Sequence, residues 1–103
     1  MHFLVIAYDH PGAPGRQRRA EVRARHLGQD TSRLAVRPVF GAAIQDDEGD
    51  VVGSMLVMEA ADRAGLDRWL KREPYVVEGV WREVTVQRCQ VGPAFLPLSP
   101  PQV

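Results

Sequence analysis

The order of apolar and polar positions predicts six main elements, in the order strand, helix, strand, strand, helix, strand. Short runs of β-branched and aromatic residues predict the strands, and apolar residues three and four positions apart predict the helices. The predicted strands are Phe3–Tyr8, Leu34–Ile44, Val51–Glu59 and Val80–Val91, and the predicted helices are Gln17–Leu27 and Asp62–Lys71. This order indicates an α+β domain of ferredoxin-like βαββαβ type, in which an antiparallel sheet carries its helices on one face.

Prolines and glycines mark where these elements end or bend. Gly28 is placed to end the first helix, and the polar stretch 45–50 predicts a hairpin turn between the second and third strands. Because proline cannot donate to a strand ladder, Pro38 predicts an edge position or a bulge in the second strand. Pro74 predicts a short extra helical turn that ends at Gly79.

Side-chain spacing predicts which face of each helix packs on the sheet. In the first helix, Ala20, Ala24 and Leu27 form one narrow stripe, which we expect to face inward. The arginines of that helix are predicted to cover much of its remaining surface: Arg16, Arg18, Arg19, Arg23 and Arg25. In the second helix, Asp62 is the expected N-cap, and the inward face is predicted to consist of Leu66, Trp69 and Leu70.

The third strand is largely apolar on both of its faces. Residues at odd and even positions between Val51 and Met58 are mostly valine, leucine and methionine. Helices on one side of the sheet cover only one of these faces, so the other needs a partner. Together with Trp81, this pattern predicts that the open face stacks on a second copy, giving a homodimer or a higher oligomer.

Composition narrows the class of protein. The chain has 103 residues and 45% hydrophobic residues, which predicts one globular domain over residues 1–92, followed by a proline-rich tail over residues 93–103. Thirteen basic and thirteen acidic residues leave no net charge to attract nucleic acid or an anionic membrane. The apolar runs are much shorter than the ~20 residues that span a bilayer. The first residues predict a strand and not a signal peptide, and a single cysteine suits the cytoplasmic location that we expect.

His26 is the strongest candidate for chemistry, with Glu73 as its partner. A neutral imidazole near pH 7 accepts or donates a proton, and a carboxylate beside it fixes its tautomer. The alternatives are a surface or structurally hydrogen-bonded histidine and a solvated loop acid. Both alternatives stay open at this point.

Four further residues are candidates for substrate binding: Asp9, His10, Arg23 and Tyr75. Asp9 and His10 end the first strand near the start of the first helix and could line the same cleft, although a polar turn before Pro11 is the better explanation of both. Arg23, with its neighbouring arginines, could attract an anionic substrate or simply form a solvated helix face. Tyr75 could stack on an aromatic ligand or pack in the core or an oligomer interface.

The sequence predicts neither a metal nor a cofactor. The histidines and the cysteine show no zinc-type spacing: His2, His10, His26 and Cys89. The chain contains neither G-x-G-x-x-G nor a P-loop.

Three segments together resemble the YciI-like (YCII-related) family: Arg23-Ala24-Arg25-His26-Leu27, Gly53-Ser54, and the stretch from Glu73-Pro74-Tyr75 to Gly79-Val80. The resemblance runs from Phe3 to about Val91. It implies a ferredoxin-like fold whose sheets pair face to face in a dimeric α/β barrel, and a His–Asp pair in a cleft. His26 matches the histidine, whereas Glu73 stands where the family usually has aspartate. Because glutamate is one methylene longer, its reach toward His26 is an open question.

Relatives with similar barrels include isomerases and dehydrochlorinases of aromatic-ring breakdown. The hypothesis is therefore a cofactor-independent lyase or isomerase that acts on a small organic molecule, for example an aromatic one, by histidine acid/base chemistry. The alternatives are a non-catalytic module that binds a small ligand and a structural subunit of an oligomer. A hydrogen bond between His26 and Glu73 beside a partly apolar pocket would favour the first hypothesis, and a pocket without that pair would favour the second.

Overall fold

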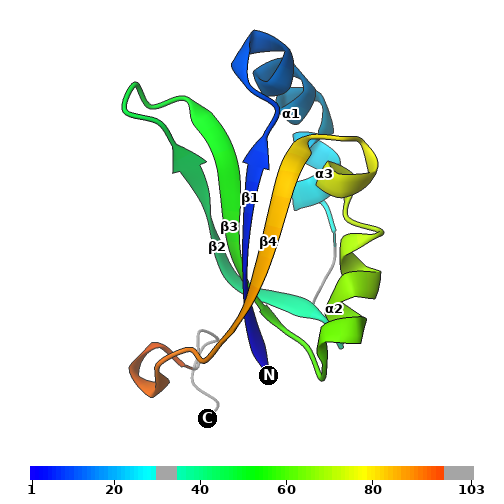
Figure 1. Cartoon of the computed structure of the whole chain (residues 1–103), viewed down its shortest axis with the longest axis vertical. Coiled ribbons are helices and arrows are strands. Elements are labelled where there is room, and N and C mark those ends of the chain that lie inside the picture. Colours follow the sequence, from blue (N-terminus) through cyan, green and yellow to red (C-terminus); the bar gives the residue numbers. More distant parts are fainter. Residues whose placement is uncertain (30–34, 97–103) are drawn as a thin grey trace.

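The chain forms an antiparallel four-stranded sheet with strand order β2-β3-β1-β4 (Figure 1). A computed structural model describes residues 1–29 and 35–96. The strands are β1 (His2–Asp9), β2 (Arg37–Gln45), β3 (Val51–Glu59) and β4 (Trp81–Cys89). The helices are α1 (Gly12–Leu27), α2 (Arg63–Leu70), α3 (Pro74–Val77) and the 3-10 turn η1 (Pro93–Phe95).

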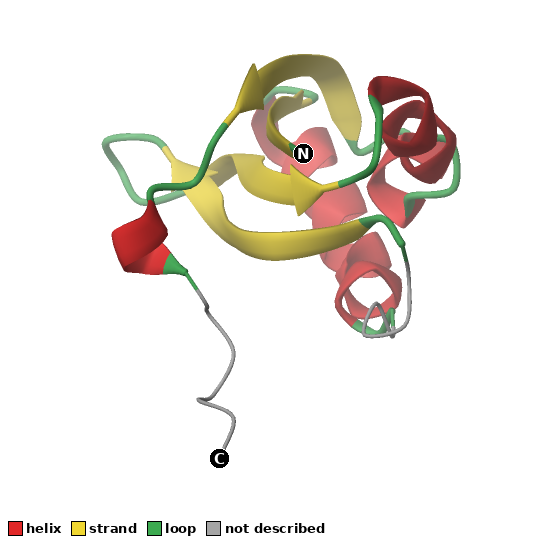
Figure 2. Ribbon diagram, turned by 90° about the horizontal axis from the view of Figure 1, so that it is seen from below, coloured by secondary structure: helices red, strands yellow, loops and turns green. Residues whose placement is uncertain are grey.

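The helices α1, α2 and α3 lie on one face of the strongly curved sheet (Figure 2). The strand β1 pairs antiparallel with both β3 and β4, and β3 pairs antiparallel with β2. The predicted ferredoxin-like α+β class is therefore confirmed. Within the described residues, no helix has the length and apolar character needed to cross a membrane.

Most predicted element boundaries lie close to the observed ones. The helix α1 begins at Gly12 instead of Gln17, because Pro14 falls in its first turn, where proline is tolerated. The strand β2 is an edge strand whose register shifts between Pro38 and Phe40, as Pro38 predicted. Pro74 opens α3, and Gly79 follows with a φ of 68°. The start of the predicted second strand at Leu34 lies outside the described residues, as does the tail from residue 97.

The predicted inward stripe of α1 was wrong. Ala20, Ala24 and Leu27 are exposed. The least exposed side of α1 and the residues after it repeats at intervals of four and three: Gly15, Arg19, Val22, His26 and Gln29. Apolar spacing misled the prediction because this inward face consists mainly of polar side chains whose partners lie elsewhere in the chain.

Two apolar clusters form the core between the sheet and the helices. One joins Phe3, Val5 and Met58 to Leu66 of α2. The other joins Val22 of α1 to Ala7, Tyr75, Val80 and Trp81. Trp69 and Leu70 pack against the first cluster, and Asp62 Oδ1 accepts a hydrogen bond of 2.7 Å from the backbone of Gly65, so the predicted inward face and N-cap of α2 are confirmed. Each fully buried large apolar side chain contributes about 1.5–3 kcal/mol.

We had predicted that Trp81 lies on the open face of the sheet. Instead it lies on the helix side. Tyr8 pairs with Glu83, but the next residue, Asp9, pairs with Trp81. The extra residue in β4 is a bulge, which reverses the alternation of side chains along the strand. As a result Trp81 is buried at the end of the sheet that carries the candidate site.

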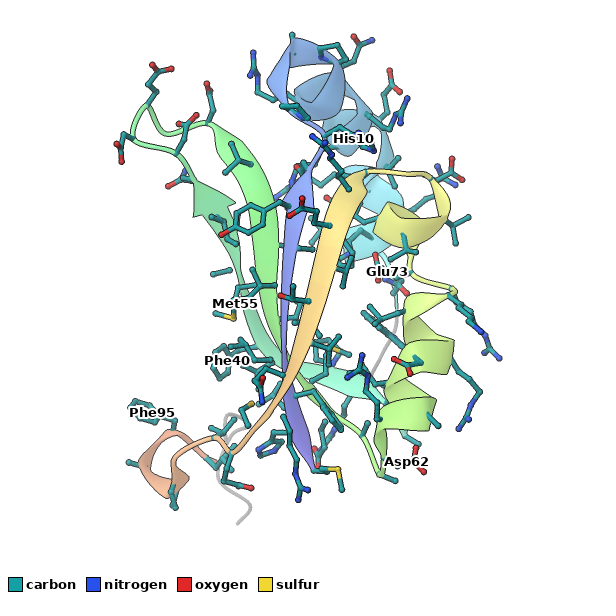
Figure 3. The ribbon with its side chains drawn as sticks, in the orientation of Figure 1. His10, Phe40, Met55, Asp62, Glu73 and Phe95 are labelled. Atoms are coloured by element: carbon teal, nitrogen blue, oxygen red, sulfur yellow. The ribbon has the colours of Figure 1, made fainter. Side chains whose placement is uncertain are left out.

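The face of the sheet away from the helices is apolar and uncovered in the single chain. Residues that pair across neighbouring strands point to the same side of the sheet. Val57 pairs with both Leu4 and Phe40, and Met55 pairs with Ile6, so these side chains share the open face. Phe40 and Met55 point away from the helices (Figure 3). At one end of this face, a cavity of about 500 Å³ is bounded by side chains that include Leu4, Phe40 and Phe95.

Candidate functional site

A cleft of about 350 Å³ lies between α1, the start of α3 and the middle of β2 and β3. Its polar lining comes from α1, β3 and α3, and its remaining walls are small or apolar. The residues that line it are Arg19, Arg23, His26, Leu27, Gly41, Ala42, Ala43, Ser54, Leu56 and Tyr75. This combination of apolar walls with a few converging polar groups is typical of a small-molecule site.

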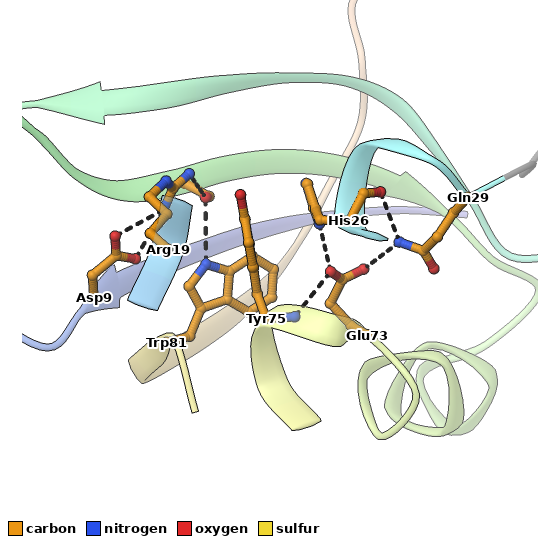
Figure 4. A network of polar contacts seen from close by, with 8 residues as sticks. Asp9, Arg19, His26, Gln29, Glu73, Tyr75 and Trp81 are labelled. Atoms are coloured by element: carbon orange, nitrogen blue, oxygen red, sulfur yellow. Dashed lines mark hydrogen bonds and ion pairs between the residues drawn. The ribbon is translucent and has the colours of Figure 1, made fainter. Parts of the chain in front are cut away.

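His26 and Glu73 form a hydrogen-bonded pair at the inner end of this cleft (Figure 4). His26 Nδ1 lies 2.5 Å from Glu73 Oε1, and the side chains are 17% and 0% exposed. The last turn of α1 supplies the histidine, and the residue before Pro74 supplies the carboxylate. The longer glutamate therefore reaches the imidazole without displacing it from the cleft.

Glu73 is held by three N–H groups. Its Oε1 also accepts from the backbone N of Tyr75 at 3.2 Å, and its Oε2 accepts from Gln29 Nε2 at 2.9 Å. Because an ionised carboxylate only accepts hydrogen bonds, His26 Nδ1 must donate to it. Within residues 1–29 and 35–96, this leaves His26 Nε2 with a lone pair that no donor occupies, which is the arrangement of a general base.

The ring of Tyr75 lies between His26 and Arg19 (Figure 4). It stacks on the imidazole with centroids 4.1 Å apart and planes 8° from parallel. The guanidinium of Arg19 lies 4.8 Å from the centre of the same ring. Tyr75 therefore positions its two neighbours and is not free to stack on an aromatic ligand.

Arg19 links the end of β1 to β3 inside the cleft. Its Nη1 lies 2.9 Å from both carboxylate oxygens of Asp9, and its Nη2 donates to Ser54 Oγ at 2.7 Å. The side chains of Arg19 and Asp9 are 13% and 3% exposed. Asp9 therefore does not line the cleft itself but fixes the arginine that does.

The hydroxyl of Ser54 is arranged to donate a hydrogen bond into the cleft. It accepts from Arg19 Nη2 and, at 3.3 Å, from Trp81 Nε1. A hydroxyl has two acceptor lone pairs and one proton, so both lone pairs of Ser54 are used. Its proton finds no acceptor among the described residues and is free to meet an oxygen of a ligand.

Burial perturbs two of the titrating groups around the cleft. It raises the pKa of Asp9, although the hydrogen bond and the charge of Arg19 lower it in part. Burial also raises the pKa of Tyr75, against the positive charges of Arg19 and Arg23. The phenol of Tyr75 therefore stays protonated at neutral pH, where it can donate a hydrogen bond.

The structure gathers most of the predicted site residues around one cleft. His26, Arg23 and Tyr75 line it, and Glu73 and Asp9 lie directly behind it. His10 is not part of this group. It lines a separate cavity with Pro11, Pro14, Gly15 and Arg18.

Sequence reasoning did not assign four residues to the roles that they have in the site: Arg19, Gln29, Ser54 and Trp81. We had assigned Arg19 to the solvated surface of the helix. The spacing of Arg19, Arg23 and His26 at i, i+4 and i+7 was the available signal, because it places all three on one side of a helix. Ser54 and Trp81 gave no such signal, since their roles depend on contacts across the sheet.

Among the described residues, the one group of acidic side chains close enough together to hold a metal ion lies at the hairpin between β2 and β3, and none of its members lines this cleft. Oxygens of Asp46, Glu48 and Asp50 lie within 4.8 Å of one another. Asp46 Oδ1 already accepts hydrogen bonds from the backbone N of Glu48 and of Asp50. These contacts explain the cluster as part of the turn.

The model of the YCII-related domain matches residues 1–90. The chain belongs to the YCII-related family. No curated protein sequence matches it significantly. Among solved structures, the chain is similar to 5-chloro-2-hydroxyhydroquinone dehydrochlorinase (TftG) from Burkholderia phenoliruptrix AC1100, in its complex with 2,5-dihydroxybenzoquinone. The TM-score is 0.67 and the identity 27%, over 91% of this chain and 98% of that one. The family assignment confirms the resemblance inferred from the sequence.

Proposed function

We propose that this member of the YCII-related family is a cofactor-independent lyase or isomerase, in which His26 removes a proton from a small, aromatic or enolic molecule. One observation carries the proposal: among the described residues that line the cleft, His26 supplies the one basic nitrogen without a donor, Nε2, and its neighbours are groups that donate hydrogen bonds. Those donors are Arg19, Arg23, the hydroxyl of Ser54 and the hydroxyl of Tyr75. Such a set suits a ligand that gives up one proton and then carries negative charge on oxygen.

The proposed reaction begins when His26 Nε2 takes a proton from the substrate. The imidazolium that forms is stabilised by the Nδ1–H hydrogen bond to Glu73, which Gln29 and the backbone of Tyr75 hold in place. The electron pair left on the substrate delocalises onto an oxygen, which accepts from Ser54 and Arg19. In a lyase this pair then expels a leaving group from an adjacent carbon. In an isomerase His26 returns the proton to a different atom.

The similar solved structure supports the class of molecule. Its name gives a chlorinated hydroxyhydroquinone as the substrate, and its bound ligand is a dihydroxybenzoquinone. Both are small hydroxylated rings whose deprotonation places charge on oxygen. The cleft of about 350 Å³ suits a small ring compound.

We also infer that two copies pair through their open sheet faces to form a dimeric α/β barrel. The support is the apolar face that follows Leu4, Ile6, Phe40, Met55 and Val57, together with the cavity of about 500 Å³ at its end. A stable pairing buries roughly 1,200 Å² or more in total. We propose a cytoplasmic location for this oligomer, on the basis of the single cysteine.

The proposed function is tested by a pair of histidine variants. Turnover is measured with hydroxylated aromatic compounds that carry a leaving group beside a hydroxyl, starting with 5-chloro-2-hydroxyhydroquinone and chloride release. His26→Asn should lower kcat by about 10²–10⁴-fold, as is typical for loss of a general base. His10→Asn is the matched control, because His10 lines a different cavity, and it should keep the activity. Activity that survives in His26→Asn, or that falls equally in both variants, contradicts the proposal.

A further inference from the structure

We propose that the substrate of this cleft carries a carboxylate in addition to its reacting oxygen, and that Arg23 binds this carboxylate and so determines specificity. The inference rests on the proposed function, because it assigns a substrate class to the same cleft. It names a recognition group that the acid/base chemistry alone does not require.

Arg23 occupies the side of α1 that forms the cleft. It stands four residues after Arg19 and three before His26, which places the three side chains on one side of the helix. All three line the cleft with Ser54 and Tyr75. Arg23 itself is exposed, so its guanidinium is open to a ligand that enters the cleft from solvent.

The positive charge of Arg23 has no counterpart within the described residues. Arg19 is paired with Asp9, and Arg25 is paired with Glu78. Arg23 forms neither an ion pair nor a hydrogen bond with any residue of 1–29 or 35–96, and no residue that lines the cleft is acidic. Glu73 lies behind His26 and already accepts three hydrogen bonds. Arg23 is therefore the one cationic side chain of the cleft lining that has no ionic partner among the described residues.

A carboxylate is the group that matches this charge. A guanidinium presents a planar fork of N–H donors that fits the two oxygens of a carboxylate. A carboxylate also carries a single negative charge, which matches the single positive charge of Arg23, whereas a phosphate monoester carries about −1.5 to −2 at pH 7. A neutral phenol or quinone would use the groups around His26 and Ser54 but would leave Arg23 without a partner.

The inference is tested by comparing two probes of similar shape, 2,5-dihydroxybenzoate and the uncharged 2,5-dihydroxybenzamide. Binding is followed by the NMR signal of the Trp81 indole N–H, which donates to Ser54 at the cleft. The chain has two tryptophans, and Trp69→Phe assigns the signals. The wild type should bind the benzoate at least about 10-fold more tightly than the benzamide, as expected for a charge-assisted hydrogen bond.

Two arginine variants separate the local contact from the overall charge. Arg23→Gln should bind both probes with equal affinity. Arg16→Gln makes the same change of charge on the same helix outside the cleft, and it should keep the preference for the benzoate. Equal binding of the two probes by the wild type, with a shift at Trp81, would overturn this inference and leave the proposed function standing. Equal loss of preference in both variants would also overturn it, and no shift with either probe would overturn this inference as well, whereas the histidine variants decide the proposed function.

Discussion

The buried pair of Arg19 and Asp9 should destabilise the fold severely when only one partner is removed. The two side chains are 13% and 3% exposed and lie 2.9 Å apart. Arg19→Met would leave the Asp9 carboxylate buried without its cation, and Asp9→Leu would leave the guanidinium without its anion. Each single variant should lose about 3–5 kcal/mol of unfolding free energy. In a domain of this size, each kcal/mol lowers Tm by about 4–8 °C.

The double variant Asp9→Leu/Arg19→Met should be more stable than either single variant. Burial raises the pKa of Asp9 in spite of Arg19, which means that the pair does not fully recover the cost of removing the carboxylate from water. Replacing a whole buried ion pair by apolar side chains of similar volume is often neutral or stabilising. We therefore expect the double variant to lie within ~1 kcal/mol of the wild type, or above it, while its cleft no longer functions.

Urea denaturation of the four proteins at neutral pH measures these differences. The pH dependence gives a second check. Because the folded-state pKa of Asp9 is raised, its contribution to stability is fully present below its unfolded pKa and is lost as the pH rises through the folded pKa. Asp9→Asn should remove this fall. Two results together would refute this reasoning: single variants that each change the free energy of unfolding by less than ~1 kcal/mol, and a double variant whose change equals the sum of theirs. They would show that the two buried charges do not depend on each other.

Four further outcomes are expected. The raised pKa of Tyr75 predicts that ultraviolet absorption shows one tyrosine ionising only at a pH above the ordinary range, and that Tyr75→Phe removes this phase; a phase that remains would contradict the assignment. Folding should weaken as the pH rises through that pKa, because the folded state favours the neutral phenol. Met55→Asp on the open sheet face should dissociate or precipitate the proposed dimer, and light scattering that finds only an 11.5 kDa species for the wild type would rule the dimer out. Deleting residues 93–103 should lower Tm by only a few degrees, corresponding to ~1 kcal/mol, since Phe95 is 68% exposed; loss of cooperative unfolding would show that the tail is required.

The sequence was sufficient to predict the fold, because the fold depends on local patterns. The apolar run of β3, the apolar spacing of α2 and the turn chemistry at Pro74 each act within a few residues, and the structure has the predicted element at each of these places. The inward face of α1 could not be predicted in this way. Its Arg19 and His26 are satisfied by Asp9 and Glu73, which come from other parts of the chain.

The candidate site was predictable only in part, for the same reason. The family resemblance and the residue types pointed to His26 and Glu73, and the structure brings the two together. The role of Ser54 depends on two donors that reach it from α1 and β4. The position of Trp81 depends on a bulge in β4 that the residue types of this strand do not predict. Contacts of this kind are a property of the assembled sheet and leave no local pattern.

The tautomer of His26 tests the central claim most directly. The chain has three histidines, and His26→Asn identifies the signals of this one in ¹⁵N NMR spectra of the imidazole nitrogens. At alkaline pH we expect a protonated Nδ1 that donates to Glu73 and an unprotonated Nε2 that faces the cleft. Glu73→Gln should remove this preference, because an amide can donate to Nδ1 as well as accept from it. A wild-type His26 that carries its proton on Nε2, or that populates both tautomers equally, would contradict the assignment of Nε2 as the catalytic base.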